Sequence, residues 1–195
     1  MSLCWTVDDV RKHLGLSDSS DPDIDAKVEQ AMAITLSTIE RYCNRLFAYR
    51  VDHEETVYKQ YSNGWQLHLW PVEGNQISID GKPVSSPKVD NQTGVAWFGG
   101  YEHVEMCDVT YTGGYEPCDF PPDLLAVLVG SITHAFEITS GGASASDSPI
   151  SKVTIPDVGT VTYDVKSSNS LISYIGGIIP AYYQSVLDLY RLHEC

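Results

Sequence analysis

Residues 108–129 read DVTYTGGYEPCDFPPDLLAVLV, and this stretch limits the possible folds more than any other part of the chain. A strand-like run ends at Gly113 and Gly114, prolines follow at positions 121 and 122, and an almost entirely apolar segment comes next. Glycine adopts a positive φ at little cost, and proline suits the first turn of a helix. The stretch therefore predicts a β segment that turns a tight corner into a helix. A helix this apolar is expected to be buried all round, either in a core or against another subunit.

Two helices are predicted before this stretch. Thr6 and Asp9 resemble a capping box at the start of a short helix. Asp21 is suited to cap a second helix with Pro22 in its first position. Apolar residues recur at helical spacing from there, so the second helix is expected to run to about Asn44.

The pattern changes to a two-residue period between positions 48 and 112. The segments WQLHLW and QISID each alternate apolar and polar residues, which indicates half-buried strands. Asp80-Gly81 follows QISID and is a strong hairpin signal. A further short strand is predicted from Gly94 to Phe98, so this region reads as a small antiparallel β lobe.

The last strand of the lobe shows a change of phase. Val104 and Met106 alternate on one face, whereas Val109 and Tyr111 alternate on the other. A β-bulge near Cys107 would restore the register, because a bulge inserts one extra residue into a strand.

The C-terminal region begins with SGGASASDSP, residues 140–149, which has the composition of a flexible linker. Two short strands are predicted at KVTI and GTVTYDV. Pro180 is expected to start a last helix that runs close to the C-terminus. One stripe of this helix is expected to dock on the helical core, and it consists of Tyr183, Val186, Leu187 and Tyr190.

A second apolar stripe on the same helix carries Tyr182 and Leu189. This stripe has no obvious use within the chain, so it either faces a partner or makes a second internal contact.

Together these elements predict an α+β fold, mainly a helical bundle of about four helices, with an inserted small antiparallel β lobe and a C-terminal strand–helix extension. The expected domain organisation is a helical bundle (1–47 and 121–139), a β lobe (48–120), a linker (140–150) and a C-terminal β segment with its helix (151–195).

Charge and cysteine content restrict the function. The formal net charge is −14 with only 12 lysines and arginines, which opposes tight binding to nucleic acid. The five cysteines are widely spaced, and none forms a C-x-x-C pair. We therefore expect free thiols, as in a reducing cytosol, without a disulfide framework. The N-terminus lacks the pattern of a signal peptide, and no apolar run is long enough to span a bilayer.

The sequence gives only weak evidence for a metal site. Asp21, Asp23 and Asp25 match the opening of an EF-hand loop, but Ala26 and Met32 occupy positions where glycine and glutamate are required, so helix capping explains the cluster better. The chain has six histidines, and no two of them have the sequence spacing of a metal-binding motif. They are His13, His53, His68, His103, His134 and His193.

Two histidines have more specific interpretations. His53 with Glu54 and Glu55 either ligates a metal or forms a solvated surface patch, and we favour the patch. His134, in the third helix, is either a buried base or a histidine hydrogen-bonded near the helix end.

No nucleophile elbow, phosphate-binding loop or dinucleotide fingerprint is present, so we expect no enzyme activity, no cofactor and no metal. One alternative is a hydrolase that uses Cys118 with a histidine. Another is a module that binds a sugar or peptide through Trp65, Trp70 and Trp97, although packing within the sheet is the simpler interpretation of these tryptophans.

Four stretches in a fixed order carry a family resemblance. They are TVDDVRKHLGL with DIDAKVEQAMAITLSTIERYCNRLF, then LHLWPVEGNQISIDGKPV, then VTYTGGYEPCDFPPDLLAVLV, and finally IPDVGTVTYDV ahead of the C-terminal helix. In this order the chain resembles the head–tail connector, or adaptor, proteins of tailed bacteriophages. The four stretches span nearly the whole chain, and none is catalytic.

The resemblance implies a structural virion protein of the neck, assembled in the cytoplasm of the bacterial host. Copies would form a ring, typically dodecameric, that lies below the portal and extends the channel through which DNA leaves during genome ejection. The implied partners are the portal protein, the next neck or tail protein and further copies of the chain, and DNA would pass without sequence-specific binding. The residues expected to bind the portal are Tyr182, Tyr183, Val186, Leu189 and Tyr190. The alternative within the neck is a stopper or tail-completion protein.

Overall fold

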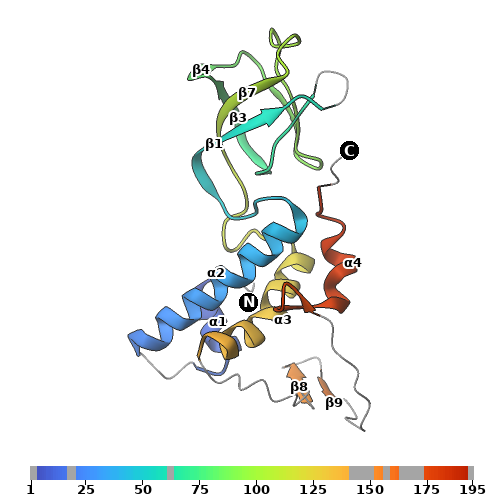
Figure 1. Cartoon of the computed structure of the whole chain (residues 1–195). Helices are drawn as coiled ribbons and strands as arrows, with labels where there is room; N and C mark the ends of the chain where they lie inside the picture. Colours follow the sequence, from blue (N-terminus) through green and yellow to red (C-terminus); the bar gives the residue numbers. More distant parts are fainter. Residues whose placement is uncertain are drawn as a thin grey trace.

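The structure is a computed structural model that describes residues 4–16, 21–60, 64–140, 152–155, 159–162 and 174–192. Helices gather in one half of the molecule and most strands in the other, and the C-terminal segment runs alongside both halves (Figure 1). The helices are α1 (Val7–His13), α2 (Pro22–Cys43), α3 (Pro122–Thr139) and α4 (Gln184–Leu187), with a 3₁₀ turn η2 (Ala181–Tyr183) before α4. The strands are β1 (Arg50–Tyr58), β2 (Trp65–Gln66), β3 (Val72–Ile79), β4 (Lys82–Pro83), β5 (Lys88–Asp90), β6 (Val95–Trp97), β7 (Met106–Gly113), β8 (Lys152–Ile155), β9 (Gly159–Thr162), β10 (Tyr174–Ile175) and β11 (Ile179–Pro180).

The predicted caps of the first two helices are confirmed. The Thr6 side chain accepts a hydrogen bond from the Asp9 N–H at the start of α1, and Asp21 accepts one from the Asp23 N–H at the start of α2. α2 ends at Asn44, whose φ of 50° stops the helix in the left-handed conformation.

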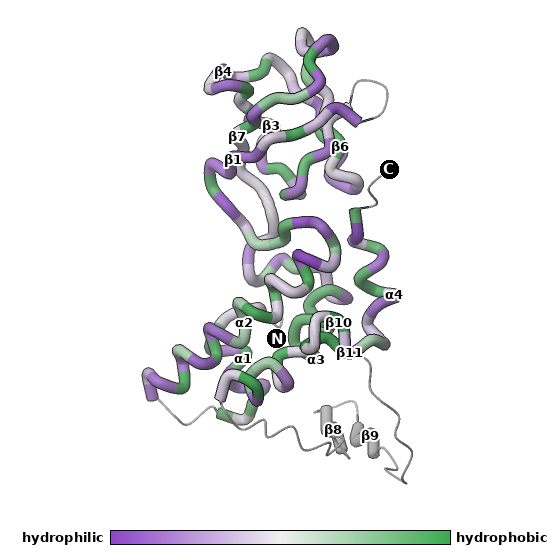
Figure 2. Tube along the Cα trace, in the orientation of Figure 1, coloured by the Kyte–Doolittle hydropathy of each residue, from purple (hydrophilic) through white to green (hydrophobic). Residues whose placement is uncertain are grey.

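α2 and α3 pack against each other and form the centre of the helical core. Apolar residues concentrate along α3 (Figure 2), and Leu124, Leu128 and Ile132 are completely buried. Within the single chain α3 is not buried all round, because Ala126 and Gly130 lie on an exposed stripe, and burial of that stripe against another subunit stays a prediction.

The β lobe contains a four-stranded sheet in the order β1-β7-β3-β4 and a three-stranded sheet in the order β2-β6-β5. Leu67, Leu69, Ile77 and Ile79 are all buried in the core between them, as their alternation predicts. Ile79 pairs with Lys82 across the Asp80-Gly81 turn, so the predicted hairpin is confirmed.

The bulge predicted near Cys107 is wrong. β7 pairs with β1 in continuous register around this position, with Cys107 opposite Val57 and Met106 opposite Tyr58. Met106 is 55% exposed and Cys107 is buried, so the strand keeps one phase to Tyr111. The register shifts instead lie in the partner strands, between Arg50 and His53 in β1 and within β3.

The glycine corner after β7 is confirmed. Gly114 has a φ of 94°, and the Tyr115 N–H donates to the Phe47 carbonyl, which joins the corner to the end of the helical region. Pro121 and Pro122 follow at the start of α3, as predicted. The corner therefore returns the chain from the β lobe to the helical core.

The predicted α+β class is confirmed, because the described residues contain both helices and antiparallel sheets in comparable amounts. Because strands contribute nearly as much as helices, the description as mainly a helical bundle is not confirmed. Two separate hydrophobic cores exist, one among the helices and one in the β lobe. The exact boundaries at 47, 120 and 150 stay predictions, and residues 141–150 of the expected linker lie outside the described residues.

The C-terminal strands are present, but the long last helix is not. β8 and β9 form an antiparallel pair at the predicted positions, and residues 163–165 of the second predicted strand lie outside the described part. After Pro180 the chain forms only η2 and the single-turn α4. The Leu192 N–H donates to the Cys43 carbonyl at 2.8 Å, so this backbone group bonds to the end of α2 in place of a helical partner.

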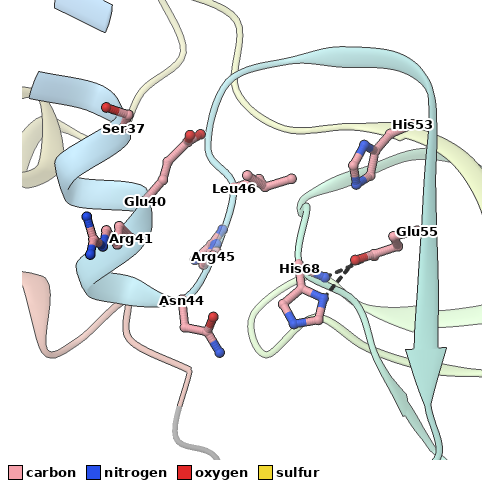
Figure 3. A pocket seen from close by; sticks show the side chains of 9 residues that line it. All are labelled: Ser37, Glu40, Arg41, Asn44, Arg45, Leu46, His53, Glu55 and His68. Atoms are coloured by element: carbon pink, nitrogen blue, oxygen red, sulfur yellow. Dashed lines mark hydrogen bonds and ion pairs between the residues drawn. The ribbon is translucent and has the colours of Figure 1, made fainter. Parts of the chain in front are cut away.

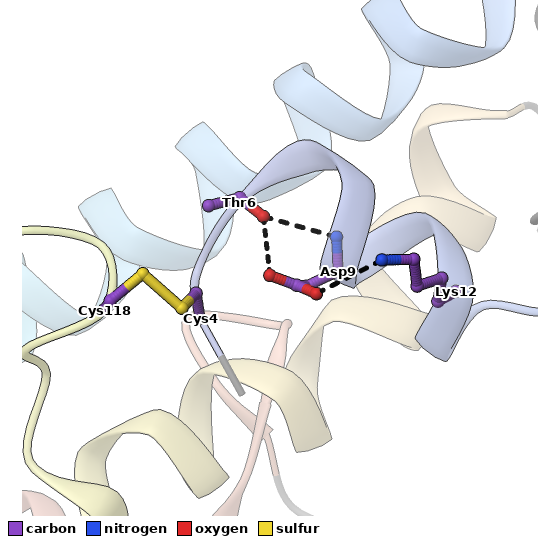
Figure 4. The surroundings of a disulfide bond; sticks show 5 residues. All are labelled: Cys4, Thr6, Asp9, Lys12 and Cys118. Carbon is purple, nitrogen blue, oxygen red and sulfur yellow. Dashed lines mark hydrogen bonds and ion pairs between the residues drawn. A yellow bond between two sulfur atoms is a disulfide. The ribbon is translucent and has the colours of Figure 1, made fainter. Parts of the chain in front are cut away.

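The expectation of free thiols is also wrong for two cysteines. Cys4 and Cys118 form a disulfide that joins the start of α1 to the loop before α3 (Figure 4). They are 114 positions apart in sequence, and the Trp5 N–H donates to the Pro117 carbonyl beside them. Cysteine spacing could not reveal this pairing, because the fold brings the two segments together. In this structure Cys118 has no free thiol, so the nucleophile that the hydrolase alternative requires is not available while the bond is formed.

Candidate functional site

The residues predicted to bind a partner divide into two sets. Tyr183, Val186 and Tyr190 pack against the helical core of their own chain. Tyr182 and Leu189 are 67% and 78% exposed. Tyr182 and Leu189 are therefore the exposed members of the set, while the other three side chains hold the segment in place.

Hydrogen bonds strengthen this attachment. The Tyr42 hydroxyl donates to Asp188 at 2.6 Å, and the Tyr190 hydroxyl donates to Asp123 at 2.6 Å. Burial, together with the neighbouring Asp123 carboxylate, raises the pKa of Tyr190. Leu187 is completely buried, so the segment is part of the helical core rather than a loosely attached tail.

A polar cluster inside the β lobe replaces the solvated patch expected around His53. The Glu55 side chain is only 11% exposed. It accepts hydrogen bonds from the His68 N–H at 3.0 Å and from the Tyr111 hydroxyl, and His68 Nδ1 lies 2.7 Å from its second oxygen. Glu55 therefore joins β1 to β7 and to the segment after β2.

We expect Glu55→Gln to reduce the free energy of unfolding by about 1.5–3 kcal/mol at neutral pH, because a charged acceptor of several hydrogen bonds is lost. Burial pushes the pKa of Glu55 upward, but the hydrogen bonds from His68 and Tyr111 outweigh it, and the net pKa is lowered. A lowered pKa in the folded state stabilises the protein above the pKa of the unfolded state, and this contribution is lost as the pH falls through the folded value.

The measurement is urea unfolding of both proteins between neutral and acidic pH. The difference in unfolding free energy should shrink as the solution becomes more acidic than the unfolded glutamate pKa of about 4.3. Glu54→Gln is the matched control, because Glu54 is the exposed neighbour on the same strand. A difference that stays constant with pH would contradict this role for Glu55.

An open cleft of about 450 Å³ lies between the C-terminal end of α2 and the β lobe. Figure 3 shows side chains from α2, from the segment that follows it and from β1 around this cleft. The lining residues are Ser37, Glu40, Arg41, Asn44, Arg45, Leu46, His53, Glu55 and His68.

Arg45 is the most buried charged residue of the cleft, with 4% of its surface exposed. Its guanidinium carbon lies 3.6 Å from the centre of the Trp70 ring and 4.8 Å from that of Phe47. The rings of Tyr115 and Tyr190 lie slightly farther away. Arg45 thus joins α2, the β lobe and the C-terminal segment through cation–π contacts.

The other candidate residues have structural positions. Asp21 caps α2, and Asp25 forms an ion pair with Arg11 at 3.1 Å. His134 is partly exposed, and its ring stacks on Tyr174 at 4.6 Å.

The structure gives little support to the alternative that the tryptophans bind a sugar or a peptide. Trp65 and Trp70 are buried in the lobe core, and Trp97 is 41% exposed. One partly exposed ring provides a much smaller stacking surface than three.

Within the described ranges, no three His, Cys, Asp or Glu side chains are placed to hold a metal ion together. The same ranges contain no helix with both the length and the apolar character needed to cross a membrane.

Comparisons with known proteins provide information on the fold. No protein-family model matches the chain, and no curated protein matches its sequence. Among solved structures, a chain from the neck of an empty gene transfer agent (GTA) particle, computed with C6 symmetry, is similar with a TM-score of 0.56 and 12% identity. A chain from the virion of a native GTA particle is similar with a TM-score of 0.53 and 11% identity. Each match covers 97% of this chain and 90% of the other, so the likeness concerns the whole fold.

Sequence reasoning missed the cleft and its central residue. Arg45 follows the end of α2 between Asn44 and Leu46, and an arginine at such a position is ordinarily exposed, so the sequence does not mark it as buried. Phe47 is a near neighbour in sequence, but the rings of Trp70, Tyr115 and Tyr190 come from distant positions that only the fold brings together.

Proposed function

We propose that this chain is a structural component of the neck of a tailed, phage-like particle, and specifically a head–tail adaptor. The observation that supports this best is the likeness of the fold, over 97% of the chain, to a chain from the neck of a GTA particle. The order of elements that resembles phage connector proteins leads to the same proposal. The role is non-enzymatic: the chain links neighbouring proteins.

In this proposal, copies of the chain form a closed ring below the portal, with twelve copies as the family resemblance implies. A ring of identical subunits needs two different complementary faces on each subunit. The two-lobed shape, with helices at one end and the β lobe at the other, provides distinct faces (Figure 1). The GTA neck with the similar chain was computed with C6 symmetry, which fits a ring.

The net charge of −14 suits a channel for DNA. Acidic residues on the inner surface of the ring would repel phosphates, so DNA would pass without sequence-specific binding.

Portal docking is assigned to Tyr182 and Leu189. Both are large, mainly exposed side chains on a segment that is firmly attached to the helical core. An exposed apolar side chain on a rigid support loses little conformational entropy when it is buried by a partner.

The test uses tailed particles produced by the genome that encodes the chain. We expect quantitative mass spectrometry of purified particles to find the chain at the copy number of the portal. A particle set made with Leu189→Asp should lack the chain, because the substitution places a charge in the portal contact. Glu137, an exposed residue of α3 outside the C-terminal segment, provides the control, and Glu137→Gln should leave the copy number unchanged.

Absence of the wild-type chain from particles would refute the neck proposal. Normal incorporation of the Leu189→Asp protein would refute the portal contact and leave the neck proposal standing. Reconstitution of purified chain with purified portal distinguishes an adaptor, which binds the portal directly, from a stopper or tail-completion protein.

A further inference from the structure

Arg45 carries a buried positive charge that has no carboxylate partner in the described part of the chain. Its Nη2 donates to the Trp70 carbonyl at 2.7 Å, but its Nε is buried and has no hydrogen-bond partner. The surrounding rings offset part of the desolvation cost through cation–π contacts. A buried charge without a counter-ion still carries a large desolvation cost, and this one lines an open cleft.

The two carboxylates that line the cleft are already occupied. Glu40 accepts hydrogen bonds from the Phe47 N–H at 2.8 Å and the Ala48 N–H at 3.4 Å, and its second oxygen lies 4.0 Å from Arg50. Glu55 is held by its own hydrogen bonds within the β lobe. Neither carboxylate is within ion-pair distance of Arg45.

The unoccupied groups of the cleft are cations and a ring nitrogen. Arg41 lines the cleft, is exposed and makes no hydrogen bond or ion pair to any described residue. His53 Nε2 is buried and has no hydrogen-bond partner. Two arginines and two glutamates line the cleft, and because both glutamates are already engaged, Arg41 is the exposed charge there that is left without a carboxylate among the described residues.

We propose that the cleft between α2 and the β lobe receives a carboxylate side chain from a second copy of this chain. The inference rests on the ring of the proposed function, and it identifies one of the two faces that such a ring needs. The chain carries 26 acidic residues against 12 basic ones, so a neighbouring copy presents many carboxylates and few competing cations. Charge complementarity of this kind also fixes the orientation in which two copies meet.

The test introduces a reactive amine into the cleft. An equal mixture of unlabelled and ¹⁵N-labelled Arg41→Lys protein is treated with a carbodiimide, which joins an amine to a carboxylate only when the two are in contact. We expect amide links between labelled and unlabelled copies at position 41, severalfold more often than at Lys27. Lys27 is the matched control because it is an exposed lysine on the same helix.

Charge reversal provides the second measurement. Arg41→Glu should weaken self-association, measured by sedimentation, at least about tenfold, because it turns an attractive contact into a repulsive one. Lys27→Glu makes the same change of charge outside the cleft and should leave self-association nearly unchanged. Both substitutions are at exposed positions, so the variants should fold.

Three outcomes would overturn the inference. The first is cross-linking at position 41 that is only within one copy or no more frequent than at Lys27. The second is equal self-association of the Arg41→Glu and Lys27→Glu proteins. The third is binding of a free dicarboxylate only, seen as a melting temperature raised by sodium glutarate without any link between copies. None of these affects the neck proposal, which depends on the presence of the chain in particles.

Discussion

Gly114→Ala is expected to reduce the free energy of unfolding by about 3–4 kcal/mol, since a left-handed backbone and a steric clash act together. Gly114 has a φ of 94°, which costs a non-glycine residue energy even in open space. A Cβ at this position would lie 2.6 Å from the Ala48 carbonyl oxygen and 2.9 Å from Leu69 Cδ1. Neither group can move freely. The Ala48 carbonyl belongs to the main chain beside the corner, and the Leu69 side chain is buried in the lobe core.

Gly100→Ala is the matched control. Gly100 has nearly the same backbone conformation, with a φ of 88°, but a Cβ there would meet no atom within 4 Å. Its substitution should therefore cost only the backbone term, about 1–2 kcal/mol. Urea unfolding of the two variants and the wild type separates the backbone term from the clash. Equal losses for both variants would show that the close approach at the corner contributes nothing.

The parts of the fold that could be predicted are those that depend on neighbours in sequence. The caps at Thr6 and Asp21 need only a side chain and an N–H two or three residues away. The Asp80-Gly81 hairpin and the burial of Ile77 and Ile79 likewise follow from local turn chemistry and alternation. Caps, turns and alternation each involve only a few consecutive residues, so a single sequence is enough to predict them.

The parts that could not be predicted depend on contacts between distant segments. Glu55 meets Tyr111 and His68 only after β1, β7 and the segment after β2 have assembled. Its sequence neighbours are polar, so the local pattern indicated a solvated patch. Arg45 is a similar case, because the rings of Trp70, Tyr115 and Tyr190 around it come from three distant regions.

The C-terminal segment could be predicted in part. Helical spacing separated Tyr182 and Leu189 from Tyr183, Val186 and Tyr190, and the exposure of these residues follows that division. The long helix that was expected to carry them is nevertheless reduced to one turn. Apolar spacing therefore predicted which side chains pack on the core, and bonding of the Leu192 N–H to the end of α2 decided the path of the backbone.

Breaking the disulfide with Cys118→Ser is expected to reduce the free energy of unfolding by about 4–5 kcal/mol. Cross-linking residues 114 positions apart restricts the unfolded chain strongly, and a loop of about 100 residues corresponds to about 4.7 kcal/mol in the chain-entropy model. The closed loop contains α1, α2 and the whole β lobe, so both cores should lose stability. The measurement is urea unfolding of wild type and variant without reductant.

The control compares Cys4→Ser, Cys118→Ser and the double variant. All three should have the same stability, because each removes the same bond and the effects cannot add. Dithiothreitol should lower the wild type to the level of the variants and leave the variants unchanged. A wild type that does not respond to dithiothreitol, or a double variant less stable than either single one, would contradict the cross-link as the source of stability. Because the proposed site of assembly is a reducing cytoplasm, the same comparison also measures how stable the chain is before the bond between Cys4 and Cys118 forms.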